Sequence, residues 1–287
     1  MRMLILCPKC KSNLDDKFRC SNGHQFSVIK NKIIDLLISD YSDSERIHWE
    51  DAESHHANLP PNKYFSSKIH ESVYSVVSIF FSKYFSVDHV KVLDIGCGAG
   101  SGLNYLKISN FKNIVYCGVD ISVNQLMKAE PKKNWNVVLI RGDANDLSFL
   151  PDDEFDIIFT SSALHHLNVK NLALHIKRML KPNGYYFLRE PSSSNIFAII
   201  GRKFVKGYHT ESETQLDPNK LKNHFGGMEL VYEKGFRFLT GSMQYLLGKF
   251  NITEQKSKLF YQICEKFDRL THSPKYSYDF IQIYRKS

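Results

Sequence analysis

The stretch that most constrains the fold is V-L-D-I-G-C-G-A-G-S-G, residues 92–102, where an apolar strand runs directly into closely spaced glycines. Gly96, Gly98 and Gly100 carry no Cβ and can take positive φ, so the backbone can turn tightly and approach a ligand. Asp94 lies in the strand end, and a serine stands where a dinucleotide-binding G-x-G-x-x-G turn has its third glycine. The stretch predicts a strand–turn–helix unit that binds a ligand through its backbone, and it fits a dinucleotide poorly.

Further apolar runs follow at intervals that suit alternating strands and helices. They lie within residues 113–119, 137–142, 155–167 and 180–191. The first two are followed by acidic residues, Asp120 and Asp143. A carboxylate at Asp120 can accept hydrogen bonds from both ribose hydroxyls of a nucleoside. Because ligands of open parallel sheets bind outside the carboxyl ends of the strands, we expect these carboxylates at one edge of one sheet.

This order of motifs resembles the class I S-adenosylmethionine (SAM) methyltransferases. The glycine turn is similar to their motif I, which takes the methionine end of the cofactor. The resemblance implies an α/β fold, a Rossmann-like sheet of seven strands, in which Asp120 binds the ribose and Asp143 meets the adenine amino group. The residues that it implies for cofactor binding are Asp94, Gly96, Gly98, Gly100, Asp120, Ile121, Asp143, Ala144 and Ser161.

The N-terminal region carries a metal-binding pattern, C-x2-C-x9-C-x3-H. Its residues are Cys7, Cys10, Cys20 and His24. Two short-spaced ligand pairs suit tetrahedral Zn²⁺, and four protein ligands leave no position for water, so we expect a structural metal. The other three cysteines are scattered, which indicates no disulfide framework.

About forty residues around this pattern resemble the zinc ribbon that heads the bacterial 23S rRNA guanine-N1 methyltransferases. The matching stretch runs from C-P-K-C to I-I-D-L-L. It departs at Asn31 and Lys32, where those enzymes have Gly-Tyr. The resemblance of the ribbon therefore does not indicate the substrate of this chain.

Length and charge bound the organisation of the chain. With 287 residues and 43% apolar content, we expect a zinc-ribbon module at 1–39, a linker with an N-terminal helix or lid at 40–89, and a SAM-binding methyltransferase domain at 90–287. No apolar run approaches a membrane span of ~18 residues, and the N-terminal run is short for a signal peptide, so we expect a cytoplasmic protein. The net charge of +8 gathers in residues 1–39 and 220–287. A basic surface can meet RNA phosphates, but the chain has no Arg-rich run.

Two regions flank the expected sheet strands and are candidates for substrate contact. Before the first strand, a helix is expected at 66–85, and an upstream lid would contain Trp49, His55, His56 and Tyr64; a surface linker is an equal alternative. After residue 191 we expect a helix at 211–225, a strand at 230–239, a helix at 254–270 and a strand at 276–285. The apolar residues of the last helix, Leu259, Ile263, Phe267 and Leu270, share one face. We expect substrate specificity to lie in residues 241–275 together with the lid.

Candidates for acid–base chemistry follow the fourth and fifth expected strands. His166 in the L-H-H-L stretch is our first candidate for a general base or a substrate-orienting group, and His165 is the second, because imidazole titrates near neutrality. Glu190, fixed by the following proline, is the third. Structural alternatives stay open: a histidine that packs or caps the next helix, and a buried carboxylate that accepts backbone amides.

The sequence favours a SAM-dependent methyltransferase that acts on an O or N atom of a small molecule, sugar, lipid or peptide intermediate. One alternative is an rRNA base methyltransferase that grips RNA through the ribbon. Another is a non-catalytic adaptor that binds SAM and zinc, although the three intact carboxylates argue against it. The oligomeric state stays open.

Overall fold

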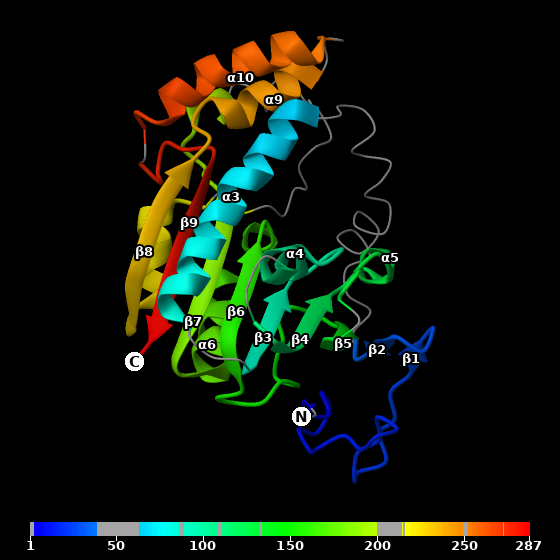
Figure 1. Ribbon diagram of the computed structural model, residues 1–287. Coiled ribbons are helices and arrows are strands. Elements are labelled where there is room, and N and C mark those ends of the chain that lie inside the picture. Colours follow the sequence, from blue (N-terminus) through cyan, green and yellow to red (C-terminus); the bar gives the residue numbers. More distant parts are fainter. Residues whose placement is uncertain are drawn as a thin grey trace.

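The fold is built on a mixed β-sheet that has helices on both faces (Figure 1). The structure, a computed structural model, describes residues 3–38, 63–85, 89–107, 111–132, 134–199, 214, 216–248, 252–271 and 273–287. Within these residues the strands follow the order β1-β2-β5-β4-β3-β6-β7-β9-β8. Strands β5, β4, β3, β6 and β7 are parallel. β9 pairs antiparallel with β7, and β8 pairs antiparallel with β9.

The strands of the sheet lie close to the apolar runs of the sequence. They are β1 (Val28–Ile29), β2 (Ile33–Asp35), β3 (His89–Ile95), β4 (Asn113–Asp120), β5 (Asn136–Arg141), β6 (Phe155–Ser161), β7 (Leu180–Pro191), β8 (Met228–Phe236) and β9 (Asp279–Lys286). β3 and β6 are central and almost wholly buried. This explains why their sequences read as continuous apolar runs rather than alternating ones.

The expected sheet of seven strands is corrected to nine among the described residues. The two added strands come from the N-terminal region: β1 and β2 form an antiparallel pair, and β2 lies parallel to β5. Strands of two and three residues are too short to show an alternating pattern, so the sequence did not reveal them. The N-terminal region thus extends the sheet.

Helices from different parts of the chain cover the two faces of the sheet. They are α3 (Lys63–Tyr84), α4 (Ser101–Lys107), α5 (Val123–Met127), α6 (Val169–Met179), α8 (Pro218–Leu221), α9 (Thr240–Gly248) and α10 (Glu254–Asp268), with 3₁₀ turns at Leu164–His166 and Lys222–Phe225. α3 packs on one face, where Phe80 contacts the rings of Tyr185 and Phe187. α6 buries Leu172 and Ile176 in a separate cluster on the other face. No helix of the described segments is long and apolar enough to cross a bilayer.

The helix expected at 211–225 is confirmed only from residue 218, as α8 followed by a 3₁₀ turn at Lys222–Phe225, and is wrong for the described residues before it. Leu216 and Asp217 are not helical, and α8 starts only at Pro218. A residue before proline is disfavoured in the helical region, and Asp217 is extended, with its side chain accepting from the Asn219 amide. Residues 200–213, which include the first part of this expected helix, lie outside the described residues.

Helices α9 and α10 fill the insertion between β8 and β9. Figure 1 shows them beyond the end of the sheet toward which the parallel strands point. Phe65 of α3, Leu247 of α9 and Tyr261 of α10 form a small buried cluster that joins the three helices. α10 buries Ser257, Tyr261 and Cys264. The apolar residues recognised in the sequence lie on the outer side of α10 and are 46–80% exposed: Leu259, Ile263, Phe267 and Leu270.

The packing of α3 on β7 can be tested with neighbouring residues. Phe80 is 4% exposed and Ile79 is 64% exposed. Phe80→Ala leaves a cavity beside Tyr185, so we expect it to lower the free energy of unfolding by about 3–5 kcal/mol in urea titrations. The matched variant Ile79→Ala should change it by less than about 0.5 kcal/mol. Equal losses would contradict this packing.

Candidate functional site

The glycine turn follows β3 at the carboxyl edge of the sheet. Gly96, Gly98 and Gly100 have φ of 63°, 50° and 92°, which side chains disfavour. A Cβ on Gly96 would lie 2.5 Å from the Cβ of Ala163, so only glycine lets the turn pack on the loop after β6. Among the residues that the structure describes, no atom lies within 4 Å of the position of a Cβ on Gly98. The backbone at Gly98 is therefore open to a ligand.

Asp94 anchors this turn from inside the protein. Its Oδ2 atom accepts hydrogen bonds from the Gly102 amide (2.9 Å) and from the Tyr116 hydroxyl (2.6 Å). A Cβ on Gly102 would come within 2.5 Å of that oxygen, which explains the fourth glycine of the stretch. Oδ1 is buried without a hydrogen-bond partner among the described residues, and burial raises the pKa of Asp94 to about 7. Asp94 thus fixes the start of α4.

Asp120 holds the same turn from the neighbouring strand. Its Oδ2 accepts from the Gly98 amide at 2.7 Å, and its Oδ1 accepts from the Ser122 amide at 2.9 Å. Unlike Asp94, the residue is only half-buried. A half-exposed carboxylate beside an open glycine backbone is suited to accept ligand hydroxyls.

The remaining residues predicted for the cofactor lie on adjacent loops at this edge. Asp143 follows β5, where its Oδ1 accepts from the Asn145 amide at 2.8 Å and burial raises its pKa. The Gly142 amide bonds the Asp120 carbonyl, which joins this loop to the end of β4. Ile121 is half-buried and Ala144 is buried. Ser161 ends β6, with its Oγ 3.2 Å from the Tyr105 hydroxyl.

The histidine stretch forms a 3₁₀ turn held by Glu190. One Glu190 oxygen accepts from the amides of Ala163 (3.0 Å) and Leu164 (2.9 Å), and the other lies 2.7 Å from Nδ1 of His165. Glu190 is fully buried. The His165 and His166 rings are 4.1 Å apart. Both Glu190 oxygens thus have partners within the chain, and His165 has its ring orientation set by a carboxylate.

A buried ion cluster at the same edge was missed in the sequence. Asp279 pairs with Arg189 (2.6 Å) and Arg237 (2.5 Å), all with side chains at most 17% exposed. Burial acts to raise the pKa of Asp279, but the two guanidinium groups hold it below its usual value. The pairing joins the ends of β7, β8 and β9. An arginine within an apolar strand was the available signal, and its partner could not be identified without the strand register.

Four side chains of the N-terminal region converge as a candidate metal centre. The ligand atoms of Cys7, Cys10, Cys20 and His24 all lie within 4.8 Å of one another. Nδ1 of His24 is 3.4 Å from the Sγ atoms of Cys7 and Cys20, and the Sγ atoms of Cys10 and Cys20 are 3.6 Å apart. Ligands of a tetrahedral zinc ion are separated by about 3.5–3.8 Å. The four residues fit the ion.

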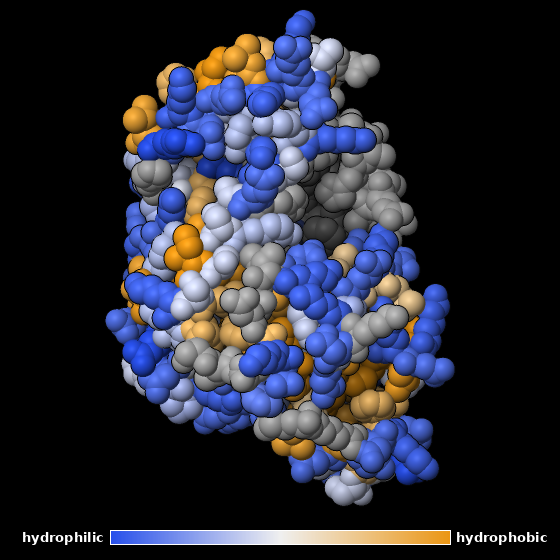
Figure 2. All heavy atoms as spheres, viewed as in Figure 1, coloured by the Kyte–Doolittle hydropathy of each residue, from blue (hydrophilic) through white to orange (hydrophobic). Residues whose placement is uncertain are grey.

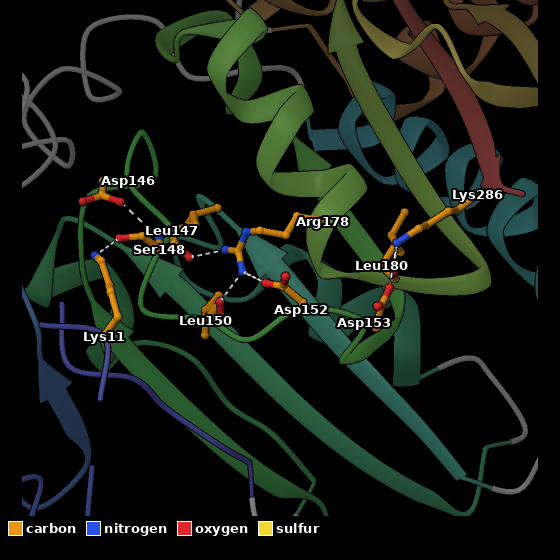
Figure 3. A network of polar contacts seen from close by, with 10 residues as sticks. All are labelled: Lys11, Asp146, Leu147, Ser148, Leu150, Asp152, Asp153, Arg178, Leu180 and Lys286. Atoms are coloured by element: carbon orange, nitrogen blue, oxygen red, sulfur yellow. Dashed lines mark hydrogen bonds and ion pairs between the residues drawn. The ribbon is translucent and has the colours of Figure 1, made fainter. Parts of the chain in front are cut away.

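The metal-binding loops rest on the loop that follows Asp143. The Leu6 amide donates to the Phe149 carbonyl at 2.8 Å, and the Lys11 ammonium bonds the Ser148 hydroxyl. Figure 3 shows Lys11 reaching Ser148, next to the network in which Arg178 holds Leu147, Leu150 and Asp152.

The predicted lid is described only in part. Trp49, His55 and His56 lie outside the described residues. Tyr64 belongs to α3, where its ring meets that of Tyr261 edge-on at 5.8 Å.

Part of the sequence matches a known family of domains. Residues 93–188, from β3 to β7, match the family model described as a methyltransferase domain. The match covers about a third of the chain, and over these residues the protein is similar to methyltransferase domains. The match begins just before the glycine turn and includes Asp94, Asp120, Asp143 and the histidine stretch.

Curated relatives share this domain with the chain. A fatty-acid O-methyltransferase of Mycolicibacterium smegmatis is 31% identical over 35% of this chain and 36% of its own length. The cyclopropane-fatty-acyl-phospholipid synthase of Escherichia coli is 34% identical over 34% and 25%. An uncharacterized methyltransferase of Synechocystis is 28% identical over 57% and 77%. The chain thus spans about a third or less of the two relatives with named activities.

Solved structures show the shared fold. The phosphoethanolamine N-methyltransferase 2 of Haemonchus contortus, in complex with S-adenosylhomocysteine, superposes with a TM-score of 0.50 at 16% identity, over 73% of this chain and 51% of that one. The [4+2]-cyclase SpnF gives 0.51 at 16% identity, over 75% and 81%. Because one of these proteins is a cyclase, the fold alone does not determine the reaction.

The buried carboxyl of Asp94 predicts a pH dependence of stability. Its pKa is about 7 in the folded chain and about 4 in an unfolded one, so the folded chain binds one more proton between these values and stability falls as the pH rises. Relative to Asp94→Asn, which keeps the shape and does not titrate, we expect the wild-type free energy of unfolding to fall by roughly 2–3 kcal/mol from about pH 5 to about pH 8. The free energies of unfolding of both proteins are measured in urea titrations. If they change equally with pH across this range, the prediction is contradicted.

Proposed function

We propose that this protein transfers a methyl group from SAM to an O or N atom of a small molecule, with lipids and their precursors as the favoured substrate class. The observation that carries the proposal is the open backbone at Gly98 beside the half-exposed carboxylate of Asp120. The methyltransferase domain supports the reaction type. The names of the fatty-acid and phospholipid relatives support the substrate class.

The carboxyl edge of the sheet offers groups for each part of the cofactor. The amides of the glycine turn suit the methionine end, Asp120 suits the ribose and Asp143 suits the adenine amino group. The Asp120 carboxylate already accepts from the Gly98 and Ser122 amides, so its position is set before a ligand arrives. Such preorganisation lowers the cost of ordering on binding.

The acceptor requires in-line positioning and, for a hydroxyl or a protonated amine, removal of a proton. When bound, SAM supplies a methyl group on a sulfonium leaving group. His165 is suited to take a proton, because Glu190 accepts from its Nδ1 and the Nε2 atom then remains as the basic nitrogen. Glu190 thereby acts as a positioning residue. His166, our first candidate in the sequence, lies against the His165 ring.

We further propose a structural Zn²⁺ ion bound by Cys7, Cys10, Cys20 and His24. Hydrogen bonds from Ser12 lower the pKa of Cys10, which favours the thiolate that binds metal. A methyl-accepting rRNA gains no support from the relatives. The three carboxylates and the open glycine turn argue against a non-catalytic adaptor.

The cofactor assignment can be tested by calorimetry. Folded protein should release or absorb heat on titration with SAM or S-adenosylhomocysteine. Asp120→Ala should weaken this binding by on the order of 1–3 kcal/mol, because it removes a charged acceptor. The matched control is Asp152→Ala, since Asp152 has a side chain 68% exposed on the far side of the loop that follows Asp143. Absence of any heat in well-folded wild-type protein would overturn the proposed function.

The metal assignment can be tested by elemental analysis. We expect about one zinc per chain, lost in Cys10→Ser and retained in Cys264→Ser, whose thiol is buried on α10 away from the cluster. Chelation of the wild-type metal should lower the melting temperature, because the metal holds loops that support the sheet edge. Metal-free protein with unchanged melting temperature would reject a structural ion.

A further inference from the structure

α10 has a packed inner face and an exposed, apolar outer face. Its inner face is held firmly: Tyr261 meets the ring of Phe65 at 5.1 Å, and Asp268 accepts from the Leu239 amide at 2.6 Å. Its outer face carries the exposed apolar residues Leu259, Ile263 and Phe267, and Leu270 follows two residues after the helix; their exposures are 59%, 46%, 53% and 80% in this order. These four residues are called the apolar stripe. Spacings of four, four and three residues align these side chains along one side of the helix. Single exposed apolar residues are ordinary, but an aligned row of them marks an interaction surface.

Further apolar residues lie near the C-terminal end of α10. Tyr276 is 53% exposed, and its carbonyl accepts from the Asn195 amide group at 2.8 Å. That contact brings the segment after Asn195 to the same end, where Ile196 and Ile199 are 57% and 40% exposed. Figure 2 shows apolar surface gathered at the end of the molecule formed by α9 and α10, with hydrophilic side chains beside it.

The charges around the stripe are mainly positive. The exposed or half-exposed basic residues on α10 and the turn that follows are Lys256, Lys258, Lys266, Arg269 and Lys275. Of the acidic residues of α10, Glu254 is exposed, Glu265 pairs with Arg269 at 3.3 Å, and Asp268 bonds Leu239 and Thr240 on the inner side of the helix. Residues 220–287 as a whole hold 12 Lys and Arg against 6 Asp and Glu. An apolar row bordered by cations complements an apolar surface that carries anions.

We propose that α10 docks this protein on the surface of an anionic phospholipid bilayer. The apolar stripe would enter the boundary between head groups and acyl chains, while the lysines and Arg269 meet lipid phosphates. Lys275, whose ammonium lies 5.5 Å from the Tyr276 ring, pairs a cation with an aromatic residue of the kind that favours this boundary. The docking does not depend on methyl transfer. It would bring the carboxyl edge of the sheet close to a source of lipid substrates.

Other occupants of this face fit less well. A second copy related by a two-fold axis would set the same cationic border against itself, which costs electrostatic energy. RNA would leave the aliphatic stripe without a partner, because single-stranded RNA is bound by aromatic stacking and cations.

The test measures binding to vesicles without a methyl acceptor. Full-length, metal-loaded protein is sedimented with vesicles of phosphatidylglycerol and phosphatidylcholine, or of phosphatidylcholine alone. We expect binding to the anionic vesicles that weakens as salt is raised. Ile263→Gln with Phe267→Gln should weaken it by roughly tenfold or more, and Lys266→Glu with Arg269→Glu should remove its dependence on anionic lipid. These side chains are exposed, so the fold should tolerate the changes.

The control variant is Leu174→Gln. Leu174 lies on α6 and is 61% exposed. It should bind vesicles as the wild type does. Equal binding to neutral vesicles, equal binding by the stripe variant, or a dimer in lipid-free solution that the stripe variant abolishes would each overturn the proposal. Calorimetry with SAM on the same variants distinguishes a failure of membrane docking from a failure of the proposed function. The variants leave the carboxyl edge of the sheet unchanged, so they should bind SAM as the wild type does.

Discussion

The glycine turn after β3 is held by two carboxylates that reach it from two strands. Asp94 binds the Gly102 amide from the buried side, and Asp120 binds the Gly98 amide from the end of β4. These bonds hold backbone that has positive φ at three glycines. The rest of the candidate site is arranged around this turn, since Ala163 packs against Gly96 and Glu190 in turn fixes Ala163. One buried and one half-exposed carboxylate therefore support the turn together.

The site is assembled from short loops on a rigid frame. Loops after β3, β4, β5 and β6 all end at the same edge, and each is closed by hydrogen bonds within two or three residues of its strand. The ion cluster of Arg189, Arg237 and Asp279 closes the antiparallel side of that edge. α3, α9 and α10 form the cover beyond it.

Local sequence patterns predict much of this arrangement. The rest depends on pairing between segments that are distant in the sequence. The five parallel strands and their terminal carboxylates were predictable because apolar runs and acidic residues alternate at fixed intervals. The spacing also predicted that Cys7, Cys10, Cys20 and His24 come together as a candidate metal centre. The two N-terminal strands, the partner of Arg189 and the two backbone contacts of Glu190 depend on register between distant segments, which no local pattern records. The outward stripe of α10 was recognised as a face, but its direction followed from Tyr261 and Asp268, whose partners lie on other helices.

The parallel pairing of β2 with β5 has a consequence for the order of assembly. Ile33, Ile34 and Asp35 pair with Leu139, Ile140 and Arg141, about a hundred residues later in the chain. During synthesis the first strands have no place to dock until β5 has emerged and joined β4. The cysteine and histidine loops need no such partner, because their ligands lie within eighteen residues of one another. The N-terminal segment can therefore join the sheet only after β5 is in place, and β2 then covers the edge of β5 against pairing with other chains.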